Sequence, residues 1–199
     1  MLFLRKITDD HLLREFRQKY ISVSGLNVPE DFLKTRSVYA AFNFKNRMCG
    51  GFVLGNINPY RTVEVFAGEE NRRKIYEFMK DTSYCELNCF WLSVKYRKGF
   101  WGYWFWILFA IKVSTQRESM LICGTIAKSL ADIYGYPRKS KLLHSEELMI
   151  NGKVRTSWIF IFARTDFFVG VLETFVYKFK NNGKKPVKYK HVKMPVSAG

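Results

Sequence analysis

The sequence is poor in cysteine and histidine, and this shortage narrows the classes of protein it can encode. It contains only 4 Cys and 3 His in 199 residues, and the His, at positions 11, 144 and 191, lie far apart. Because CxxC pairs and paired His motifs are missing, the spacing predicts no metal site. Asp9 and Asp10 follow only a short apolar start, which is not the pattern of a secretory leader. We therefore expect a cytoplasmic protein with reduced thiols.

Long hydrophobic runs are also missing. The longest, from Gly99 to Ile111, has thirteen residues and ends at Lys112. A membrane span needs about 20 residues, so this run predicts a core helix. Cations stand at both ends of the run, Arg97 and Lys98 before it and Lys112 after it. They leave contact with a membrane surface open as an alternative.

Acidic residues are scarce as well. Lys and Arg number 33 against 17 Asp and Glu, which gives a formal net charge of +16. Such a field attracts an anionic partner: nucleic acid, a membrane surface, a phosphorylated cofactor or an acidic protein. Seven Lys and no acid occur from Lys178 to Gly199. We expect one domain over residues 1–179, followed by a basic, flexible tail over residues 180–199 that can contact an acidic carrier protein.

Aromatic residues, in contrast, are abundant at 17% of the chain, which indicates a large aromatic core, an apolar binding cavity, or both. The hydrophobic periodicity alternates between strand and helix and predicts a mixed α and β fold. The expected strands are residues 2–7, 37–44, 48–54, 62–66, 84–94, 120–123, 142–150 and 156–163. The expected helices are residues 9–22, a short one from 29, 69–80, 100–113, 126–134 and 166–179.

The strand at 84–94 and the basic turn after it carry the chemistry. Both faces of the strand are apolar except for Glu86 and Asn88, which share one face. The turn contains Arg97 and Lys98 and leads into the aromatic helix, whose first N–H groups have no partner inside the helix. This pattern predicts an anion site, although it is neither a Walker loop nor a GxGxxG motif.

The stretch from Leu92 to Gly102 resembles the acyl-thioester motif of the GNAT acyltransferase superfamily, a strand followed by R/Q-x-x-G-x-G/A and a helix. Arg97 matches the first motif position and Gly102 the last, while Phe100 replaces the middle Gly. The resemblance covers about residues 1–165. It implies an α+β fold with a central mixed, mostly antiparallel sheet flanked by helices.

The same resemblance implies a co-substrate, an acyl-CoA or acyl carrier protein thioester. Three residues of the motif would line the arm of the thioester: Leu92, Ser93 and Val94. Six would hold its phosphate: Arg97, Lys98, Gly99, Phe100, Trp101 and Gly102.

Within the superfamily, the strand with an early acid is similar to that of the acyl-homoserine-lactone and long-chain N-acyl amino acid synthases, which have a Glu-x-x-Arg run. Here Glu86-Leu87-Asn88-Cys89 keeps the Glu and lacks the Arg, which argues against homoserine lactone formation. GNAT maturases that lipidate peptides are a further relative. The helix at 126–134, followed by Gly135-Tyr136, is similar to the late Tyr-bearing helix of the family.

The resulting hypothesis is an N-acyltransferase that moves a medium or long acyl chain to a primary amine of a small molecule or peptide. Glu86 would accept the amine proton, Asn88 would position water or substrate, and Tyr134 or Tyr136 would protonate the departing thiolate. Structural roles for Glu86 and Asn88, in a salt bridge and a core hydrogen bond, stay open. The alternative function is a basic protein that binds nucleic acid or a membrane surface without catalysis, although no nucleic-acid-binding signature is present.

Overall fold

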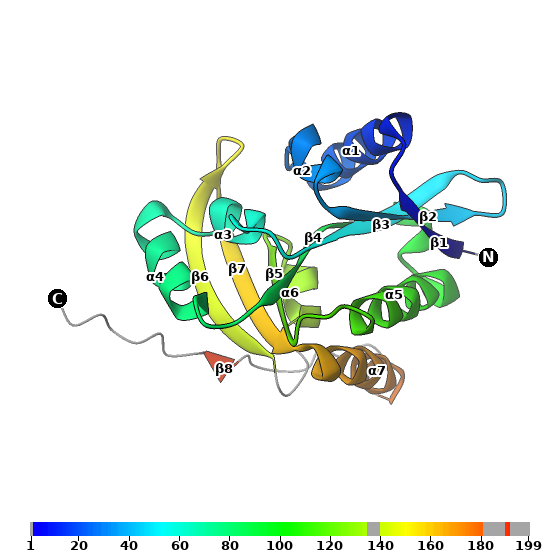
Figure 1. Cartoon of the computed structure of the whole chain (residues 1–199). Helices are drawn as coiled ribbons and strands as arrows, with labels where there is room; N and C mark the ends of the chain where they lie inside the picture. The colour runs from blue at the N-terminus through cyan, green and yellow to red at the C-terminus, as the bar shows by residue number, and fades with distance from the viewer. Residues whose placement is uncertain (1, 135–139, 181–189, 192–199) are drawn as a thin grey trace. The chain divides into compact units, whose positions relative to one another are not determined.

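The computed structural model describes residues 2–134, 140–180 and 190–191 (Figure 1). The chain forms two compact units. Unit 1 comprises residues 1–55 and 87–112, and unit 2 comprises residues 56–86 and 113–199. Strand β4 (Tyr84–Leu92) contributes to both, because the boundary between the units falls after Glu86.

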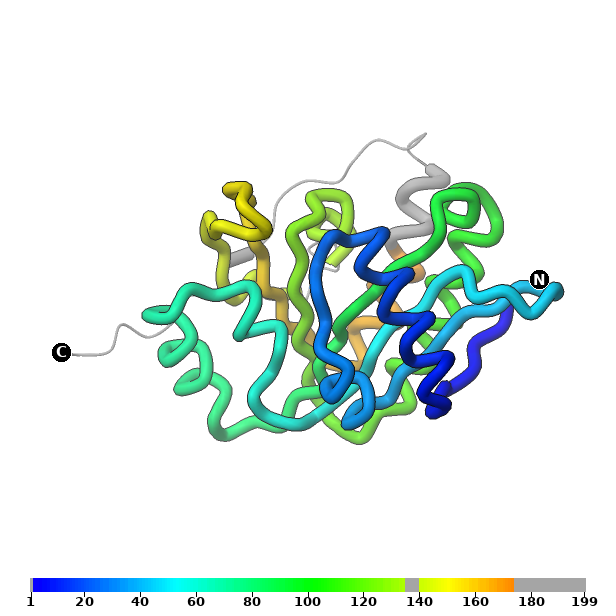
Figure 2. Tube along the Cα trace, turned by 90° about the horizontal axis from the view of Figure 1, so that it is seen from above, coloured from blue at the N-terminus to red at the C-terminus, as the bar shows by residue number. Residues whose placement is uncertain are grey.

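Unit 1 contains a set of strands with helices on both faces. Strands β1 (Leu2–Ile7), β2 (Ser37–Asn43) and β3 (Met48–Gly55) pair antiparallel, and the order is β1-β2-β3-β4. Helices α1 (Asp10–Ser24) and α2 (Glu30–Lys34) cover one face, and α1 crosses the strands in the view of Figure 2. Helix α5 (Gly99–Ser114) lies against the opposite face, as Figure 1 shows.

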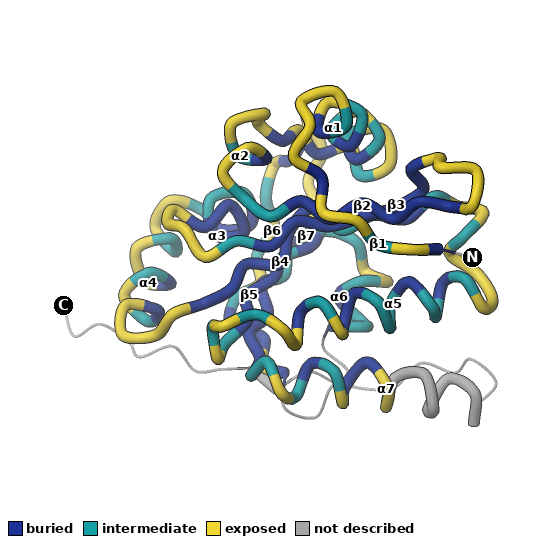
Figure 3. The backbone as a smooth tube through the Cα atoms, turned by 45° about the vertical axis from the view of Figure 1, so that its right-hand side comes forward, coloured by how far each residue is buried: buried dark blue, intermediate teal, exposed yellow. Residues whose placement is uncertain are grey.

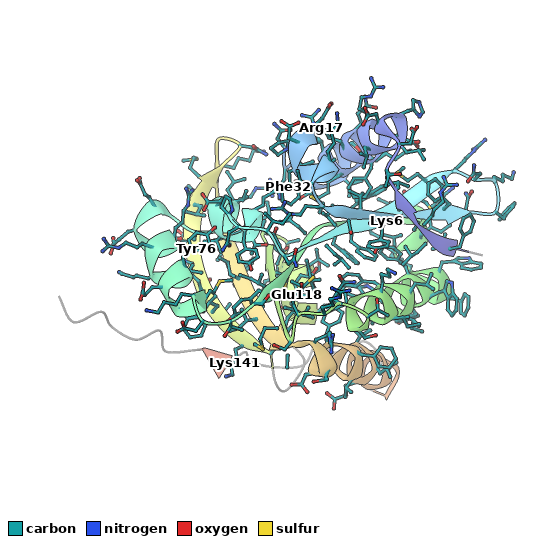
Figure 4. All side chains as sticks on the ribbon, in the orientation of Figure 1. Lys6, Arg17, Phe32, Tyr76, Glu118 and Lys141 are labelled. Carbon is teal, nitrogen blue, oxygen red and sulfur yellow. The ribbon has the colours of Figure 1, made fainter. Side chains whose placement is uncertain are left out.

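Local sequence determines where α1 begins and ends. The Asp9 carboxylate accepts hydrogen bonds from the backbone N–H groups of His11 and Leu12, which satisfies two donors of the first turn. Leu13, Phe16 and Tyr20 are buried at helical spacing. Gly25 ends the helix with a left-handed φ of 71°. Figure 4 labels Arg17, whose Nε donates to the carbonyl of Val28 and ties α1 to the segment that leads into α2.

The core of unit 1 is aromatic, as the composition predicts. The ring of Phe52 on β3 contacts Phe105 and Phe109 of α5, with centroids 6.3 Å and 4.5 Å away. Phe90 of β4 contacts the same two rings at 5.3 Å and 5.0 Å. These four side chains make up the aromatic layer between α5 and its strands.

Unit 2 contains the remaining strands and four helices within its described ranges. Its strand order is β4-β5-β7-β6-β8, with antiparallel β5–β7 and β6–β7 pairs and a parallel β6–β8 pair. The strands are β5 (Met120–Thr125), β6 (Lys141–Ile150), β7 (Lys153–Ala163) and β8 (Lys190–His191). The helices are α3 (Arg61–Phe66), α4 (Glu69–Met79), α6 (Lys128–Tyr134) and α7 (Arg164–Lys180).

The predicted α+β fold class is confirmed, and the predicted strand at 62–66 is wrong. That segment forms α3, although Thr62 and Val63 are β-branched. Phe66 lies so close to Gly124 of β5 that a side chain there would meet its ring at 2.1 Å. Glu86 accepts a hydrogen bond from the N–H of Thr62. These tertiary contacts outweigh the weak local preference for strand.

The strand predicted over 84–94 ends at Leu92, and its last residues enter a short 3-10 helix, η1 (Val94–Tyr96). Of the predicted tail, Lys190 and His191 form β8, while residues 181–189 and 192–199 lie outside the described residues. The Gly135-Tyr136 pair lies outside them as well. None of the helices in the described ranges combines the length and hydropathy that crossing a bilayer requires.

All four cysteines are buried thiols. Burial raises the pKa of the Cys49 thiol to about 11 and that of Cys123 well above its ordinary value. The thiols of Cys49 and Cys123 therefore stay protonated at neutral pH and behave as small apolar side chains.

Candidate functional site

In unit 1, the end of β4 is fastened to the turn that follows it. The Arg97 Nε donates to the Leu92 carbonyl at 2.7 Å, which closes the turn on itself. The Ser93 N–H donates to the carbonyl of Cys49 on β3 at 2.8 Å. Asn43, at the end of β2, donates from Nδ2 to the hydroxyl of Tyr96 at 3.0 Å. The turn thus has a fixed position at the ends of β2 and β3.

Positions 99 and 102 of the motif favour glycine for different structural reasons. Gly99 has a φ of +66°, a left-handed conformation that disfavours residues with a side chain, and a Cβ there would meet no atom within 4 Å. At Gly102 a Cβ would lie 2.6 Å from the carbonyl oxygen of Arg97. Gly102 therefore lets the first turn of α5 pack directly on the backbone of the basic turn.

The charges around the start of α5 are unusual. Lys95, Arg97 and Lys98 are exposed, and no Asp or Glu occurs between residues 87 and 112. Cations near a helix N-terminus are unfavourable, because the N-terminal N–H groups already carry partial positive charge. An anion bound there would offset both contributions. The sequence prediction placed a phosphate at this turn for the same reason.

Midway along β4 the regular alternation of side chains is interrupted. Cys89 has a φ of +50°, and the Asn88 Oδ1 accepts hydrogen bonds from both the N–H and the Sγ of Cys89, at 2.7 Å and 3.3 Å. Beyond this point Phe90 contacts α5 and Trp91 contacts Phe16 of α1. The oxygen of Asn88 therefore stabilises an irregular backbone in the middle of the strand.

In unit 2, Glu86 is 1% exposed and its Oε1 accepts from the N–H of Thr62 in the first turn of α3. Sequence reasoning missed this interaction because it assigned α3 to a strand. It also missed Arg61, the first residue of α3, which is a cation only 7% exposed. The sequence gives no clear signal of this burial, because the same short segment also contains Thr62 and Glu64.

Tyr134, the third predicted catalytic residue, is the last residue of α6. Its side chain is 3% exposed, and its ring lies 6.3 Å and 6.4 Å from the rings of Phe160 and Phe162 on β7. The ring is part of the core of unit 2. The neighbouring candidate Tyr136 falls outside the described residues.

A second carboxylate of unit 2 binds a helix start. Glu146 of β6 accepts hydrogen bonds from the N–H of Gly68, at the N-cap of α4, and from Nδ2 of Asn71. Its Oε1 also lies 2.8 Å from Nε2 of His144. Burial raises the pKa of Glu146, but the bonds from Gly68 and His144 outweigh burial and hold it below its ordinary value.

Beside α4, Tyr76 (labelled in Figure 4) donates from its hydroxyl to Glu64 of α3 at 2.9 Å. Burial, followed by this bond to Glu64, raises the pKa of Tyr76 far above its ordinary value. Among residues 2–134, 140–180 and 190–191, no group of three His, Cys, Asp or Glu side chains is arranged to hold a metal ion.

The fold agrees with that of known acyltransferases, although no family model and no curated sequence matches the chain. FeeM, an N-acyl amino acid synthase from uncultured soil microbes, superposes with a TM-score of 0.60 at 10% identity, over 88% of this chain and 98% of FeeM. Spermidine N-acetyltransferase from Vibrio cholerae, in complex with CoA and spermine, gives 0.51 at 11% identity, over 83% of this chain and 97% of that chain.

A phosphinothricin acetyltransferase of the GNAT superfamily from Sinorhizobium meliloti, in complex with AcCoA, gives a TM-score of 0.53 at 11% identity, over 81% of this chain and 88% of that one. The order of helices and strands, the β4–turn–α5 unit and these superpositions agree. The chain has the fold of the GNAT acyltransferases.

Proposed function

We propose that the protein is an N-acyltransferase that transfers an acyl group from a thioester to a primary amine. The observation that carries this proposal is the start of α5 in unit 1. It combines a left-handed Gly99, a Gly102 packed on the backbone of the turn, and the exposed cations Arg97 and Lys98. This arrangement suits the phosphate groups of coenzyme A or of a carrier-bound phosphopantetheine.

In this proposal the basic turn binds the donor. Arg97 and Lys98 contact phosphate oxygens, and the backbone from Gly99 to Gly102, including Phe100 and Trp101, surrounds them. Leu92, Ser93 and Val94 lie along the pantetheine arm. Because the Arg97 Nε is already bonded to the Leu92 carbonyl, the remaining nitrogens of its guanidinium group would make the contact with phosphate.

The reaction requires a base and an acid. The amine nitrogen attacks the thioester carbonyl, the C–N bond forms, and the C–S bond breaks. We assign the amine proton to Glu86, directly or through water, and the proton that the thiolate receives to Tyr134. Asn88 is assigned a positioning role, because its oxygen fixes the irregular backbone of β4 at Cys89.

A medium or long acyl chain is the donor that we favour. The likeness to FeeM, whose name is that of an N-acyl amino acid synthase, is compatible with an acyl group other than acetyl. The aromatic content of unit 1 supports a longer chain, since α5 carries three Trp side chains, at positions 101, 104 and 106, that are only partly buried. An amine of a small molecule or of a peptide is the proposed acceptor, and coenzyme A or an acidic carrier protein is the proposed carrier of the acyl chain.

Isothermal titration of acetyl-, octanoyl- and palmitoyl-CoA into the full chain tests the donor site. We expect Arg97→Ala with Lys98→Ala to weaken binding of all three by at least ten-fold, because each charge-assisted contact contributes about 1.5–3 kcal/mol. The matched control is Lys153→Ala with Arg155→Ala, which removes two exposed cations from β7 of unit 2. Equal affinity in the basic-turn variant and the wild type would contradict the proposal.

The same titration tests the acyl preference. Each buried methylene contributes about 0.8 kcal/mol, so two further carbons should tighten binding about ten-fold until the site is full. Equal affinity for all three donors would exclude the long-chain preference and leave the transferase proposal standing.

A further inference from the structure

Unit 1 presents a group of exposed basic and apolar side chains at one end. We define this basic apolar tip as the β2–β3 connection together with the turn that leads into α5. Its members are Phe44, Lys45, Arg47, Val94, Lys95, Arg97, Lys98 and Phe100. The hydrogen bond between Asn43 and the hydroxyl of Tyr96 holds the two segments together. In Figure 3 the β2–β3 connection is drawn as exposed, next to the buried strands that it joins.

The apolar members of the tip project into solvent to an unusual degree. Phe44 is 76% exposed, Val94 74% and Phe100 66%. Because exposing such side chains is unfavourable, a cluster of three at one end of a unit is typical of an interaction surface. The ammonium group of Lys45 lies 5.8 Å from the ring of Phe44, and that of Lys95 lies 4.9 Å from the ring of Tyr96.

The charge of the tip has one sign. It contains five Lys and Arg, and no Asp or Glu occurs in residues 32–55 or 87–112. The acids of unit 1 all fall between residues 9 and 31, on or beside α1 and α2. The tip is therefore positive without local compensation, and its partner should be an anionic surface.

Helix α5 continues the apolar surface away from the tip. Phe100, Trp104, Ile107 and Ile111 share one side of the helix at helical spacing, and Phe100 and Ile111, which is 47% exposed, mark its ends. The Trp104 Nε1 donates to the carbonyl of Leu2 at 2.9 Å, which fixes that ring beside β1. A 16-residue helix extends about 24 Å. Trp and Phe side chains next to Lys and Arg are typical of a membrane interface.

We infer that the basic apolar tip docks unit 1 on the surface of an anionic phospholipid bilayer. The cations attract the anionic headgroups, and Phe44, Val94 and Phe100 enter the boundary between headgroups and acyl chains. Nucleic acid or an acidic protein would satisfy the cations, whereas an anionic bilayer also provides an apolar region for the three exposed side chains. The tip shares Val94, Arg97, Lys98 and Phe100 with the proposed donor site, so the decisive test uses the β2–β3 connection alone. The inference itself does not depend on the proposed reaction.

Sedimentation of the full chain with lipid vesicles tests this inference. The probes are vesicles of phosphatidylcholine alone and of phosphatidylcholine mixed with phosphatidylglycerol. We expect binding to the mixed vesicles and at least ten-fold weaker binding to the neutral ones. Each cation near an anionic surface contributes about five-fold, so raised salt should reduce binding.

The decisive variant changes only the β2–β3 connection, which has no part in the proposed donor site. Phe44→Ser with Lys45→Glu and Arg47→Glu should lower vesicle binding at least ten-fold and leave the melting temperature and acyl transfer unchanged. Its matched control is Val154→Ser with Lys153→Glu and Arg155→Glu, which makes the same change of charge at exposed positions of β7. The control should bind as the wild type does.

Phe44→Ser alone separates insertion from simple charge attraction. It should weaken vesicle binding several-fold and leave the retention of the protein on heparin unchanged. Three results would each overturn the inference: no binding to the mixed vesicles, equal loss in the triple variant and its control, or unchanged vesicle binding by Phe44→Ser. If the protein binds duplex DNA and does not bind vesicles, the tip is a nucleic-acid surface instead.

Discussion

The starts of α3 and α4 in unit 2 differ from the start of α5 in unit 1. In unit 2 the starts of α3 and α4 each bind a carboxylate from a distant strand. Glu86 accepts from Thr62 at the start of α3, and Glu146 accepts from Gly68 at the start of α4. At the start of α5, the exposed charged side chains are Lys95, Arg97 and Lys98, all of one sign.

This difference indicates which helix starts have a structural role and which one can bind a ligand. A helix start whose donors are satisfied by the protein's own carboxylate contributes to stability and has no need of a ligand. A helix start surrounded by cations carries an unfavourable positive charge in the unbound protein, and binding of an anion relieves it. The comparison therefore supports the proposed anion site at α5 and indicates structural starts for α3 and α4. Glu86 is the residue to which we assign both a structural and a catalytic role.

The largest expected effect tests the two roles of Glu86. Glu86→Gln keeps an oxygen for the N–H of Thr62, so we expect a change in the free energy of unfolding below about 1 kcal/mol but at least a hundred-fold loss of acyl transfer. Glu86→Ala should lose the same activity and also about 1–3 kcal/mol of stability, because a buried N–H loses its acceptor. Denaturant titration measures the free energy of unfolding, and a steady-state assay measures the rate of acyl transfer. Full activity in Glu86→Gln would leave Glu86 with its structural role alone.

The next effect compares the two glycines at the start of α5. Gly102→Ala places a Cβ against the carbonyl oxygen of Arg97, so we expect a loss of about 1–3 kcal/mol and of donor binding. Gly99→Ala meets no neighbouring atom and should cost about 1 kcal/mol through its left-handed φ alone. Each kcal/mol corresponds to about 2–4 °C in the melting temperature of a chain of this size. A smaller loss in Gly102→Ala than in Gly99→Ala would show that the turn is looser than the structure indicates.

The smallest effect concerns pH. The folded pKa of Glu146 is lowered, so its ionised form contributes stability above the ordinary carboxyl pKa, and this contribution disappears as the pH falls through the folded value. We expect the melting temperature of the wild type to fall more steeply below about pH 4.5 than that of Glu146→Gln. At neutral pH the wild type should be the more stable of the two. Parallel melting curves for the two proteins at all pH values would exclude this contribution.

Much of the fold follows from local sequence, and the exceptions are tertiary. The Asp9 cap and the strand–turn–helix unit at Gly102 could be predicted, because each depends on neighbouring residues. The same holds for the turn between β6 and β7, where Asn151 and Gly152 have left-handed φ values of 52° and 70°. The helical state of α3 could not, since it depends on contacts with Glu86 and Gly124, far away in the sequence.

The candidate site also combines features that local sequence predicts with features that it does not. The exposed cations of the basic turn were predicted from their position before an aromatic helix. The irregular backbone at Cys89 and the bond from the Arg97 Nε to the Leu92 carbonyl were not, because neither has a sequence signature. Burial of Arg61 at the start of α3 was missed for the same reason as α3 itself.

The buried thiols have a practical consequence for the study of this protein. Cys49 and Cys89 belong to unit 1, and Cys85 and Cys123 belong to unit 2. Because reagents attack exposed thiolates, labelling of these side chains requires the surrounding structure to open first. Time-resolved alkylation followed by peptide mass analysis would therefore report the opening rate of each unit separately. The native cysteines thus provide a separate probe of opening for each unit without engineered labels. Their alkylation rates distinguish cooperative unfolding from the independent opening of either unit.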